Sequence, residues 1–324
     1  MDVLSDVLSA VRLTGAVYFD VRARAPWVAG TPPISTIGAR VMPDFEHVMA
    51  FHVMMDGRCW AQLADESAPP VELVQGDAVL FVDGQGHVMS SDRGSCGVPN
   101  VEMYYRPKDR ALPFSVEELG GHGEPARFVC GYLGCDARPF NPILDALPRI
   151  LHVRAARDGG KLTRELILLA LAERERPRAG GESLLARLSE LMFIQAVRHY
   201  IEGLQPEATG WLAGLRDHHV GAALRLMHGR PAEPWTLESL ARETGLSRSV
   251  FAERFTHVMG APAMQYLANW RLQIARRLLE GQRMSIAQAA AAVGYESEAA
   301  LNRAFRKRIG MPPGAWRRGR SSAR

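Results

Sequence analysis

The sequence predicts a multidomain α+β protein, with an antiparallel β-barrel in its N-terminal part and an all-α domain at its C-terminus. Residues 20–140 contain short apolar segments separated by Gly, Pro and Asp, which is typical of antiparallel barrels and sandwiches. From Pro142 onward, the apolar residues recur every three or four positions, the period of an α-helix. A chain of 324 residues can bury two or three cores. We therefore expect three regions: a barrel over 1–140, a helical linker or dimerisation region over 141–205, and a helical domain over 206–324.

The expected strands of the barrel region follow one another at short intervals. They are His47–Met55, Cys59–Leu63, Pro70–Leu73, Asp77–Val82, Gly86–Ser90, Glu102–Tyr105 and Phe128–Leu133. Gly57 and Gly76 mark turns between them. Before these strands, apolar residues fall at helical spacing at Leu4, Val7, Leu8 and Val11. This spacing, next to acidic residues, predicts an amphipathic helix and not a signal peptide.

The sequence also bears on the compartment. The longest apolar run, Leu166–Ala172, is too short to span a bilayer, so we expect no membrane partner. The cysteines at 59, 96, 130 and 135 form no CxxC pair. In a chain without an export signal we expect free thiols and a cytoplasmic location.

Helical patterns fill the middle of the chain. One apolar stripe runs through Ile143, Leu147, Ile150 and Leu151, and a second covers Leu162–Glu175. The charged segment Glu173–Glu182 is the expected loop before a third helix, Leu184–Tyr200. The apolar face of that third helix consists of Leu184, Leu188, Leu191 and Ile194. Two interpretations stay open for this helical pair: a dimer surface, or a cover for the core of its own domain.

The C-terminal region is basic and contains a repeated pattern. Residues 217–324 hold 17 Arg and Lys against 8 Asp and Glu, a net charge of +9, whereas residues 1–216 hold 22 against 27, a net charge of −5. A basic domain on an acidic body suggests a polyanionic partner for that domain. The pattern occurs first at Leu240–Ala241, Gly245, Phe251, Phe255, Gly260 and Pro262, and again at Ala289–Ala290, Gly294, Leu301, Phe305, Gly310 and Pro312. It predicts two helix-turn-helix units.

Each predicted unit has its own start signals and a polar outer face. Thr236 and Ser247 are the expected N-caps of the first unit, and Ser285 to Gln288 form a capping box before Ser297 caps the last helix of the second. Buried positions are Val250, Phe251, Phe255 and Val258 in the first unit and Leu301, Phe305 and Ile309 in the second. Outward positions are Arg248, Ser249, Ala252, Glu253 and His257 in the first, and Glu298, Ala299, Asn302, Arg303 and Arg306 in the second.

Between the units, a helix from Pro262 to about Leu279 forms a rod of roughly 27 Å. Such a rod can hold two reading heads about one duplex turn, ~34 Å, apart. Arginine can bond bidentately to guanine, asparagine to adenine, and glutamate can accept from cytosine N4. The other arginines and Lys307 suit phosphates.

This region resembles the DNA-binding domain of AraC/XylS-family transcription regulators. The resemblance rests on WTLESLA, GLSRSVFAERF, WRLQIARRLL and AAAVGYESEAALNRAFRKRIGMPPGAWRR, about 100 residues in all. It places the base-reading positions of the family at Ser249, Ala252 and Glu253 in the first unit and at Glu298, Ala299, Asn302 and Arg303 in the second. The alanines offer only apolar contact to a thymine methyl group. We therefore expect base specificity mainly in the second unit.

The N-terminal half resembles the cupin-type sensor of one AraC-family branch, which includes regulators that respond to oxidants. The matching segments are RLTGAVYFDVRARAPW, FHVMMDGRCW, FVCGYLGCD and LPRILHV. Gly76, Asp77, Gly84 and His87 have the spacing of the second cupin motif, with Val82 where proline is usual. The paired histidines and the glutamate of the first motif are missing.

Four residues are candidates for the sensor: His52, His87, Cys96 and Cys130. A metal in this domain would use His52 and His87, but two histidines are fewer than the three or four ligands that zinc or iron requires. One interpretation directs both histidines into the barrel from adjacent strands. The other makes one a core residue and the other a loop residue. Cys96 is the expected exposed thiol, whereas Cys59 and Cys130 are expected to be buried and inert.

Together these observations predict a transcription regulator and not an enzyme. The resemblance implies double-stranded DNA, an effector that is a small molecule or an oxidant, a homodimer and, if the protein is an activator, RNA polymerase. Two alternatives are a cupin oxygenase and an architectural DNA-binding protein without a ligand.

Overall fold

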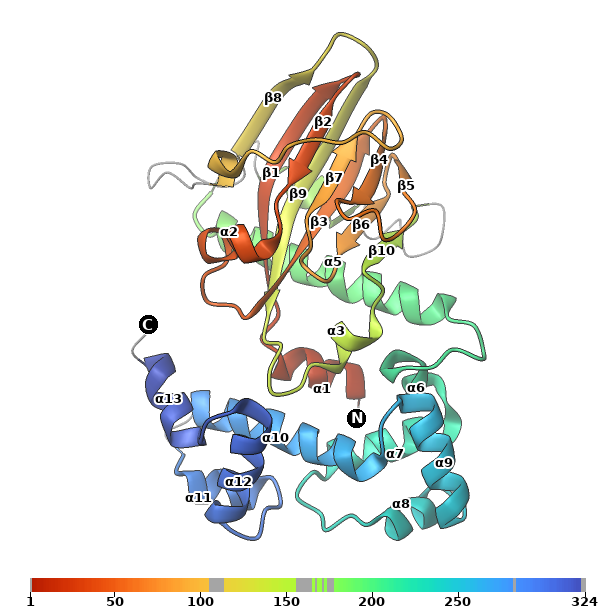
Figure 1. The fold of residues 1–324 in the computed structure, drawn as a ribbon, viewed down its shortest axis with the longest axis vertical. Coiled ribbons are helices and arrows are strands. Elements are labelled where there is room, and N and C mark those ends of the chain that lie inside the picture. Colours follow the sequence, from red (N-terminus) through yellow and green to blue (C-terminus); the bar gives the residue numbers. More distant parts are fainter. Residues whose placement is uncertain are drawn as a thin grey trace. The chain divides into compact units, whose positions relative to one another are not determined.

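A computed structural model describes residues 2–104, 114–155, 165–166, 168–170, 172–173, 178–281 and 284–321 (Figure 1). The chain forms two compact units, and each draws on separate segments. The sheet unit comprises Leu13–Asp136 and Leu147–Gly203. The helical unit comprises Met1–Arg12, Ala137–Ala146 and Leu204–Arg324. The expected boundaries after 140 and 205 cut the chain only twice, whereas the helical unit also takes in the first residues of the chain and the segment from Ala137 to Ala146.

The sheet unit holds its strands in two sheets. These strands are β1 (Thr14–Arg24), β2 (Val28–Thr31), β3 (His47–Asp56), β4 (Arg58–Leu63), β5 (Val71–Val74), β6 (Ala78–Phe81), β7 (His87–Ser90), β8 (Phe114–Gly120), β9 (Pro125–Cys135) and β10 (Ile150–Val153). One sheet has the order β10-β6-β3-β9-β1-β8 and the other β2-β7-β4-β5. Both sheets contribute to one buried core, for example through Phe128 and Leu73. Closure into a barrel stays a prediction, because the described strands hydrogen-bond as two separate sheets.

The expectation of purely antiparallel pairing is wrong at one edge, where β1 and β8 are parallel. β1 lies between β8 and β9 in the sheet, and it is antiparallel to β9. The short connection from β8 to β9 passes around the end of β1, where the Gly121 and Gly123 N–H groups donate to Arg24 and Ala25 carbonyls. A strand inserted between two antiparallel neighbours must be parallel to one of them.

Two predicted elements have a different structure. Glu102–Tyr105 was expected as a strand, but η1 (Val101–Tyr104) is a 3-10 helix, and Tyr105 lies outside the described residues. The helical stripe across 143–151 is wrong in its second half. Helix α3 (Pro142–Ala146) ends before Pro148, and Ile150 and Leu151 belong to β10, which pairs with β6. Proline disfavours helical backbone in the residue that precedes it, which separates the two elements.

Helix α5 (Gly181–Gly203) packs against β1, β9 and β10 (Figure 1). A Cβ atom at Gly15 of β1 would lie 2.3 Å from the Cβ of Ser189, so the glycine lets the helix approach the strand closely. The predicted apolar stripe is only partly buried. Leu188 is buried, but Leu184 and Leu191 are 42% and 46% exposed, because Met192, Phe193 and Ala196 supply the buried face. The other helix of the sheet unit bounded in the described residues is α2 (Ile34–Val41).

The helical unit is built from the N-terminal helix and the C-terminal helices. Its described elements besides α3 are α1 (Val3–Ala10), α6 (Trp211–Arg216), α7 (His218–Gly229), α8 (Leu237–Glu243), α9 (Arg248–Met259), α10 (Ala263–Gly281), α11 (Ile286–Ala292), α12 (Glu298–Ile309) and α13 (Pro313–Ser321). The predicted caps at Thr236, Ser247, Ser285 and Ser297 are all present. No described helix is long and apolar enough to cross a bilayer.

The pairs α8/α9 and α11/α12 lie at the two ends of α10 (Figure 1). Each pair turns at a glycine with left-handed backbone, Gly245 with φ 72° and Gly294 with φ 78°. Phe251 and Phe255 are buried in the first pair, and Leu301 and Phe305 in the second, as predicted. Val250 is a correction, since it is 49% exposed, and Val258 and Ile309 are half-buried where burial was predicted. Val250 lies in the first turn of α9, and Phe251 and Phe255, four residues apart, fill the contact with the neighbouring helices.

Candidate nucleic-acid interface and sensor core

Helices α9 and α12 present the predicted reading residues on their outer faces. Arg248, Ser249, Glu253, Glu298, Ala299, Arg303, Arg306 and Lys307 are exposed, and Ala252 and Asn302 are half-buried. Among the described residues, the side chains of Glu298, Asn302 and Arg303 make no hydrogen bond or ion pair. Their donors and acceptors are therefore available to a ligand. Basic residues also fill the last turn of α12, with Arg306, Lys307 and Arg308.

Two arginines of these helices are engaged inside the protein. Arg254 of α9 forms an ion pair with Asp217, with a distance of 2.7 Å between its terminal nitrogen and the carboxylate. Asp217 also caps α7 by accepting from the His219 and Val220 N–H groups. Arg308 of α12 donates through Nε to the Pro139 carbonyl at 3.0 Å. These two side chains hold their helices in place.

Helix α10 is held by two segments that flank the sheet unit in sequence. Gln273, only 1% exposed, donates through Nε2 to the Ala10 carbonyl at 2.8 Å. Its Oε1 accepts from the Phe140 N–H at 3.3 Å. Arg276, also buried, donates to the Arg138 carbonyl and lies 5.3 Å from the Trp316 ring centroid. One buried amide thus joins α1, the segment 137–146 and the connecting helix.

Helix α1 also contributes a carboxylate to a buried polar cluster. The Tyr266 hydroxyl lies 2.8 Å from both Trp211 Nε1 and His228 Nε2. The other nitrogen of His228 is 3.6 Å from an Asp6 oxygen, beyond hydrogen-bond distance. Burial lowers the pKa of His228 to about 3 and raises the pKa of Asp6. His228 is therefore neutral at physiological pH.

The sensor candidates His52, His87 and Cys130 meet in the core of the sheet unit. His52 Nε2 lies 2.6 Å from His87 Nε2, and His52 Nδ1 lies 2.9 Å from Cys130 Sγ. Both histidines point inward, but β3 and β7 belong to different sheets, so they meet across the core and not from adjacent strands. His87 begins a strand and is buried, which excludes its interpretation as a loop residue. The ring of Phe81 stacks on it with 3.8 Å between centroids.

Burial keeps this cluster neutral. It lowers the pKa of His52 to about 3 and the pKa of His87 well below its usual value. It also raises the pKa of the Cys130 thiol. These residues do not fit a metal, because the two ring nitrogens of His52 face different partners and the three donors do not converge on one point. No group of three His, Cys, Asp or Glu residues suited to a metal occurs among the described residues.

Cys59 and Cys96 have the expected exposure. Cys59 is fully buried, its thiol lies 3.5 Å from the Met54 sulfur, and burial raises its pKa to about 12. Cys96 is exposed and Cys135 is buried, and all four are free. A high thiol pKa disfavours the thiolate that reacts with oxidants, so Cys59 and Cys130 are poorly placed for such chemistry.

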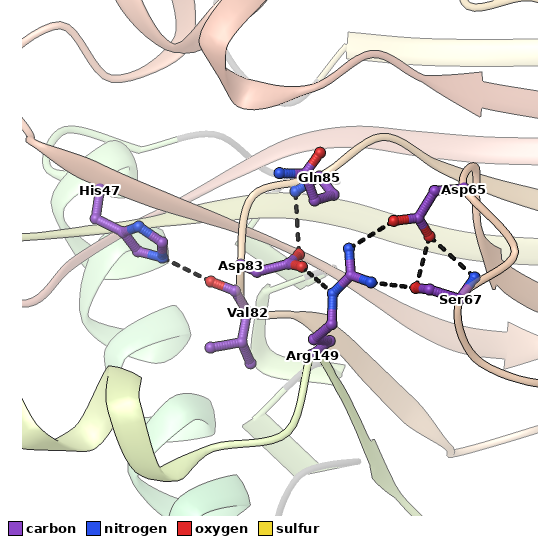
Figure 2. Close-up of polar contacts among 7 residues, drawn as sticks. All are labelled: His47, Asp65, Ser67, Val82, Asp83, Gln85 and Arg149. Atoms are coloured by element: carbon purple, nitrogen blue, oxygen red, sulfur yellow. Dashed lines mark hydrogen bonds and ion pairs between the residues drawn. The ribbon is translucent and has the colours of Figure 1, made fainter.

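An exposed network holds the loop that leads to His87 (Figure 2). The Arg149 guanidinium donates to Asp83, to Ser67 and to Asp65, the last at 2.8 Å. Asp83 also accepts from the Gln85 N–H at 3.1 Å. Nearby, His47 Nε2 donates to the Val82 carbonyl at 2.6 Å. The start of β10 is thereby joined to the loops that follow β4 and β6.

A cavity of about 630 Å³ opens where β1 and β8 end and β9 begins. Its charged lining includes Arg22, Arg24 and Arg127 together with Asp56 and Glu117. Arg127 is paired bidentately with the buried Asp20. Since both signs of charge line the cavity, it indicates no particular class of ligand.

Sequence reasoning missed Arg271, Gln273, Arg276 and Arg308, whose side chains hold the helical unit together. A signal for Gln273 was present. It follows the buried Trp270 by three residues, so it lies on the inward face of α10, where an amide needs partners.

Both halves of the chain are similar to known protein families. Residues 2–202 match the family described as Cupin, and residues 240–319 match the family described as Helix-turn-helix domain. An AraC-like transcription regulator of Streptomyces lividans is 30% identical over 98% of this chain and 98% of its own length. The RCS-specific HTH-type transcriptional activator RclR of Escherichia coli is 31% identical over 71% of this chain and 83% of its own. Among solved structures, the DNA-binding domain of AdpA in complex with a target DNA is 30% identical and covers 33% of this chain and 96% of that one, with a TM-score of 0.32.

Proposed function

Because the chain belongs to the AraC-type family of DNA-binding transcription regulators with an N-terminal cupin domain, we propose that it reads a specific DNA sequence through two helix-turn-helix heads under the control of the sheet unit. The observation that carries this proposal is the pair of capped helices α9 and α12 at the two ends of α10. On α12, the outward side chains of Glu298, Asn302 and Arg303 have no hydrogen-bond or ion-pair partner among the described residues. A regulator of this kind works where the DNA is, in the cytoplasm. If it is an activator, it also contacts RNA polymerase.

We assign most of the base specificity to the second head. Asn302 and Arg303 of α12 offer bidentate hydrogen bonding to adenine and guanine. Glu298 can accept from cytosine N4, and Ala299 can contact a thymine methyl group. The first head offers Ser249, Ala252 and Glu253, a weaker set. Arg248, Arg306 and Lys307 supply phosphate contacts, which give affinity without sequence information.

The proposed route of control runs through the two segments bonded to Gln273. The chain passes from α1 into β1 through Val11–Leu13, and from β9 into the segment 137–146 through Asp136. Thr14 and Gly134 are register partners in the β1–β9 ladder, so the two segments leave the sheet side by side. A change in this ladder would reach Gln273 and Arg276 on α10 and, through Pro139, Arg308 on α12. The effector then shifts a population of DNA-binding states.

We propose that α5 forms a homodimer surface. Leu184 and Leu191 lie one heptad apart on its exposed side, while the buried side covers the sheet. Leu168 and Leu169, in the helical residues before the loop, are exposed as well. Exposed leucines on neighbouring helical segments suit a self-complementary contact.

The proposed effector is a small molecule or an oxidant. RclR, a relative over most of the chain, is named as RCS-specific. Of the four thiols, Cys96 is the exposed one, so it is the proposed site of any oxidant reaction, and the His52–His87–Cys130 cluster is the proposed internal element that responds.

A cupin oxygenase and a ligand-free architectural protein are the competing functions. The relatives compared above are named as transcription regulators, and the buried donors do not converge on a metal. Stoichiometric iron or manganese lost in the His52→Gln variant would favour the oxygenase. DNA binding unchanged across a wide ligand and oxidant screen would favour the architectural protein.

Selection from a random duplex pool by the full-length protein tests the function. We expect enriched sequences with two conserved boxes about one duplex turn apart. Enrichment of a single box, or of none, would contradict two-headed reading. Repeating the selection with oxidised protein and with the Cys96→Ser variant tests the sensor proposal: an equal oxidant effect in both proteins would exclude Cys96.

A further inference from the structure

The first head comprises α8 and α9, and the second comprises α11 and α12. The turns within the two heads have the same backbone hydrogen bonds but different surroundings. In the first, the Gly245 N–H donates to the Arg242 carbonyl and the Leu246 N–H to that of Ala241. In the second, Gly294 and Tyr295 make the equivalent bonds to Ala291 and Ala290. A Cβ atom at Gly245 would meet nothing within 4 Å, whereas one at Gly294 would lie 2.5 Å from the Ala232 carbonyl oxygen and 2.8 Å from its Cα.

The segment that contacts Gly294 comes from the other head. Residues 230–235, which we name the brace, connect α7 to the cap of α8, the first helix of the first head. Trp235 stiffens the brace by donating through its indole nitrogen to the Arg230 carbonyl at 3.0 Å. The Arg230 guanidinium also lies 4.7 Å from the Trp235 ring centroid. The brace is thus a defined structure attached to the first head and packed on the turn of the second.

Arg271 fastens the brace to the connecting helix. Its Nε donates to the Pro231 carbonyl and a terminal nitrogen to the Glu233 carbonyl, both at 2.7 Å. Burial lowers the pKa of Arg271, and the neighbouring Tyr295 of the second turn opposes this shift. Two charge-assisted bonds from one planar group fix direction as well as distance.

We infer that the brace locks the two heads in one relative position, so that Arg271 and Gly294 determine which spacing of the two DNA boxes the protein accepts. This inference rests on the proposed two-headed reading. Without the brace, the two heads would be joined only by α10 and by the contacts that each head makes with one end of α10. With it, the entry segment of the first head is also bonded to α10 through Arg271 and packed against the turn of the second head at Gly294. Glycine is required at 294 for close approach as well as for its φ, whereas at 245 only the φ requires it.

A locked pair of heads should be intolerant of altered spacing. One base pair inserted between the boxes moves the second box by about 3.4 Å along the axis and rotates it by about 35°. Heads in a fixed position cannot follow both changes, so one head loses its base contacts. The loss of a single good contact lowers affinity by roughly tenfold.

The test measures the affinity of the full-length protein for a selected two-box duplex and for the same duplex with one base pair inserted. For the wild-type protein we expect the affinity for the selected duplex to exceed the affinity for the duplex with the insertion by a ratio of about ten or more. Arg271→Ala and Gly294→Ala should bring the ratio toward one, each by weakening the brace. The matched controls are Arg277→Ala, which removes an exposed charge from the same helix, and Gly245→Ala, which strains the equivalent turn. Both should keep the wild-type ratio.

Thermal melting of each variant shows whether it is folded, which separates loss of folding from loss of discrimination between the two duplexes. The two brace variants, Arg271→Ala and Gly294→Ala, change different contacts. If wild-type protein tolerates the insertion, or if both brace variants keep the wild-type ratio, the brace has no role in spacing while two-headed reading stands. If no two-box duplex is bound at low salt, the proposed function itself fails, and the inference fails with it.

Discussion

Replacement of Gln273 by leucine removes a side chain that bonds to both segments flanking the sheet unit in sequence, at Ala10 and at Phe140. The variant leaves the Ala10 carbonyl and the Phe140 N–H buried without a partner. An unsatisfied buried polar group costs about 1–3 kcal/mol. Because the bond to Phe140 is long, at 3.3 Å, we expect a total near the lower half of the summed range, about 2–4 kcal/mol.

Hydrogen exchange of the α10 amides, followed by mass spectrometry, measures this change within the helical unit. A loss of about 2 kcal/mol raises exchange through opening of the unit by roughly 30-fold. Gln265→Leu is the matched control, since Gln265 lies exposed on the same helix. Equal exchange of α10 in the two variants would refute the reasoning that Gln273 joins the three segments.

The remaining predictions concern pH and assembly. The pKa of His52 is about 3 in the folded protein and about 6.5 when unfolded, so its neutral form stabilises the fold above pH 6.5, and that stability is lost as the pH falls toward 3. The free energy of unfolding of the sheet unit in urea should therefore fall by roughly 1 kcal/mol per pH unit for His52 between pH 6 and pH 4, with His87 adding to the slope. An unchanged slope in His52→Gln would contradict this assignment. Leu191→Asp should shift the protein toward the monomer in sedimentation velocity, whereas Ser183→Asp on the same helix should not, and an unaltered dimer in Leu191→Asp would place the dimer contact elsewhere.

The helical unit could be predicted closely because its signals are local. The capping residues Thr236, Ser247, Ser285 and Ser297 lie within three residues of the N–H groups that they accept from, and the glycine turns need only their own φ. Helix starts, turns and most inward positions therefore followed from short stretches of sequence. Val250 differed because burial depends on tertiary contacts, and Phe251 and Phe255 form the buried face of α9.

The sheet unit could be predicted only in part because strand pairing is not local. The segments of β3 to β7 were recognisable from composition, but the insertion of β1 between β8 and β9 joins residues about 100 positions apart. Pro148 was a local signal against a continuous helix across 143–151. The helical spacing of the apolar residues on both sides of it nevertheless led to the prediction of one helix. The division of β3 and β7 between two sheets could not be read from their sequences.

The candidate site shows the same contrast. The outward residues of α9 and α12 follow from helical geometry once the helices are known. Gln273 and Arg271 depend on partners 263 and 40 residues away, so their roles required the structure. Cys130 as the partner of His52 likewise depended on the register of β3 and β9, in which these two residues are opposite each other.

The most direct test of sequence-specific reading by the second head is the affinity of Arg303→Ala for a selected duplex and for random DNA. Arg303 makes no hydrogen bond or ion pair among the described residues, so its loss should leave the fold intact. We expect a loss of about 1–3 kcal/mol on the selected duplex, relaxed specificity at one position, and little change on random DNA. An equal loss on both kinds of DNA would mean that Arg303 contacts only phosphate, and would contradict the account of base reading by α12.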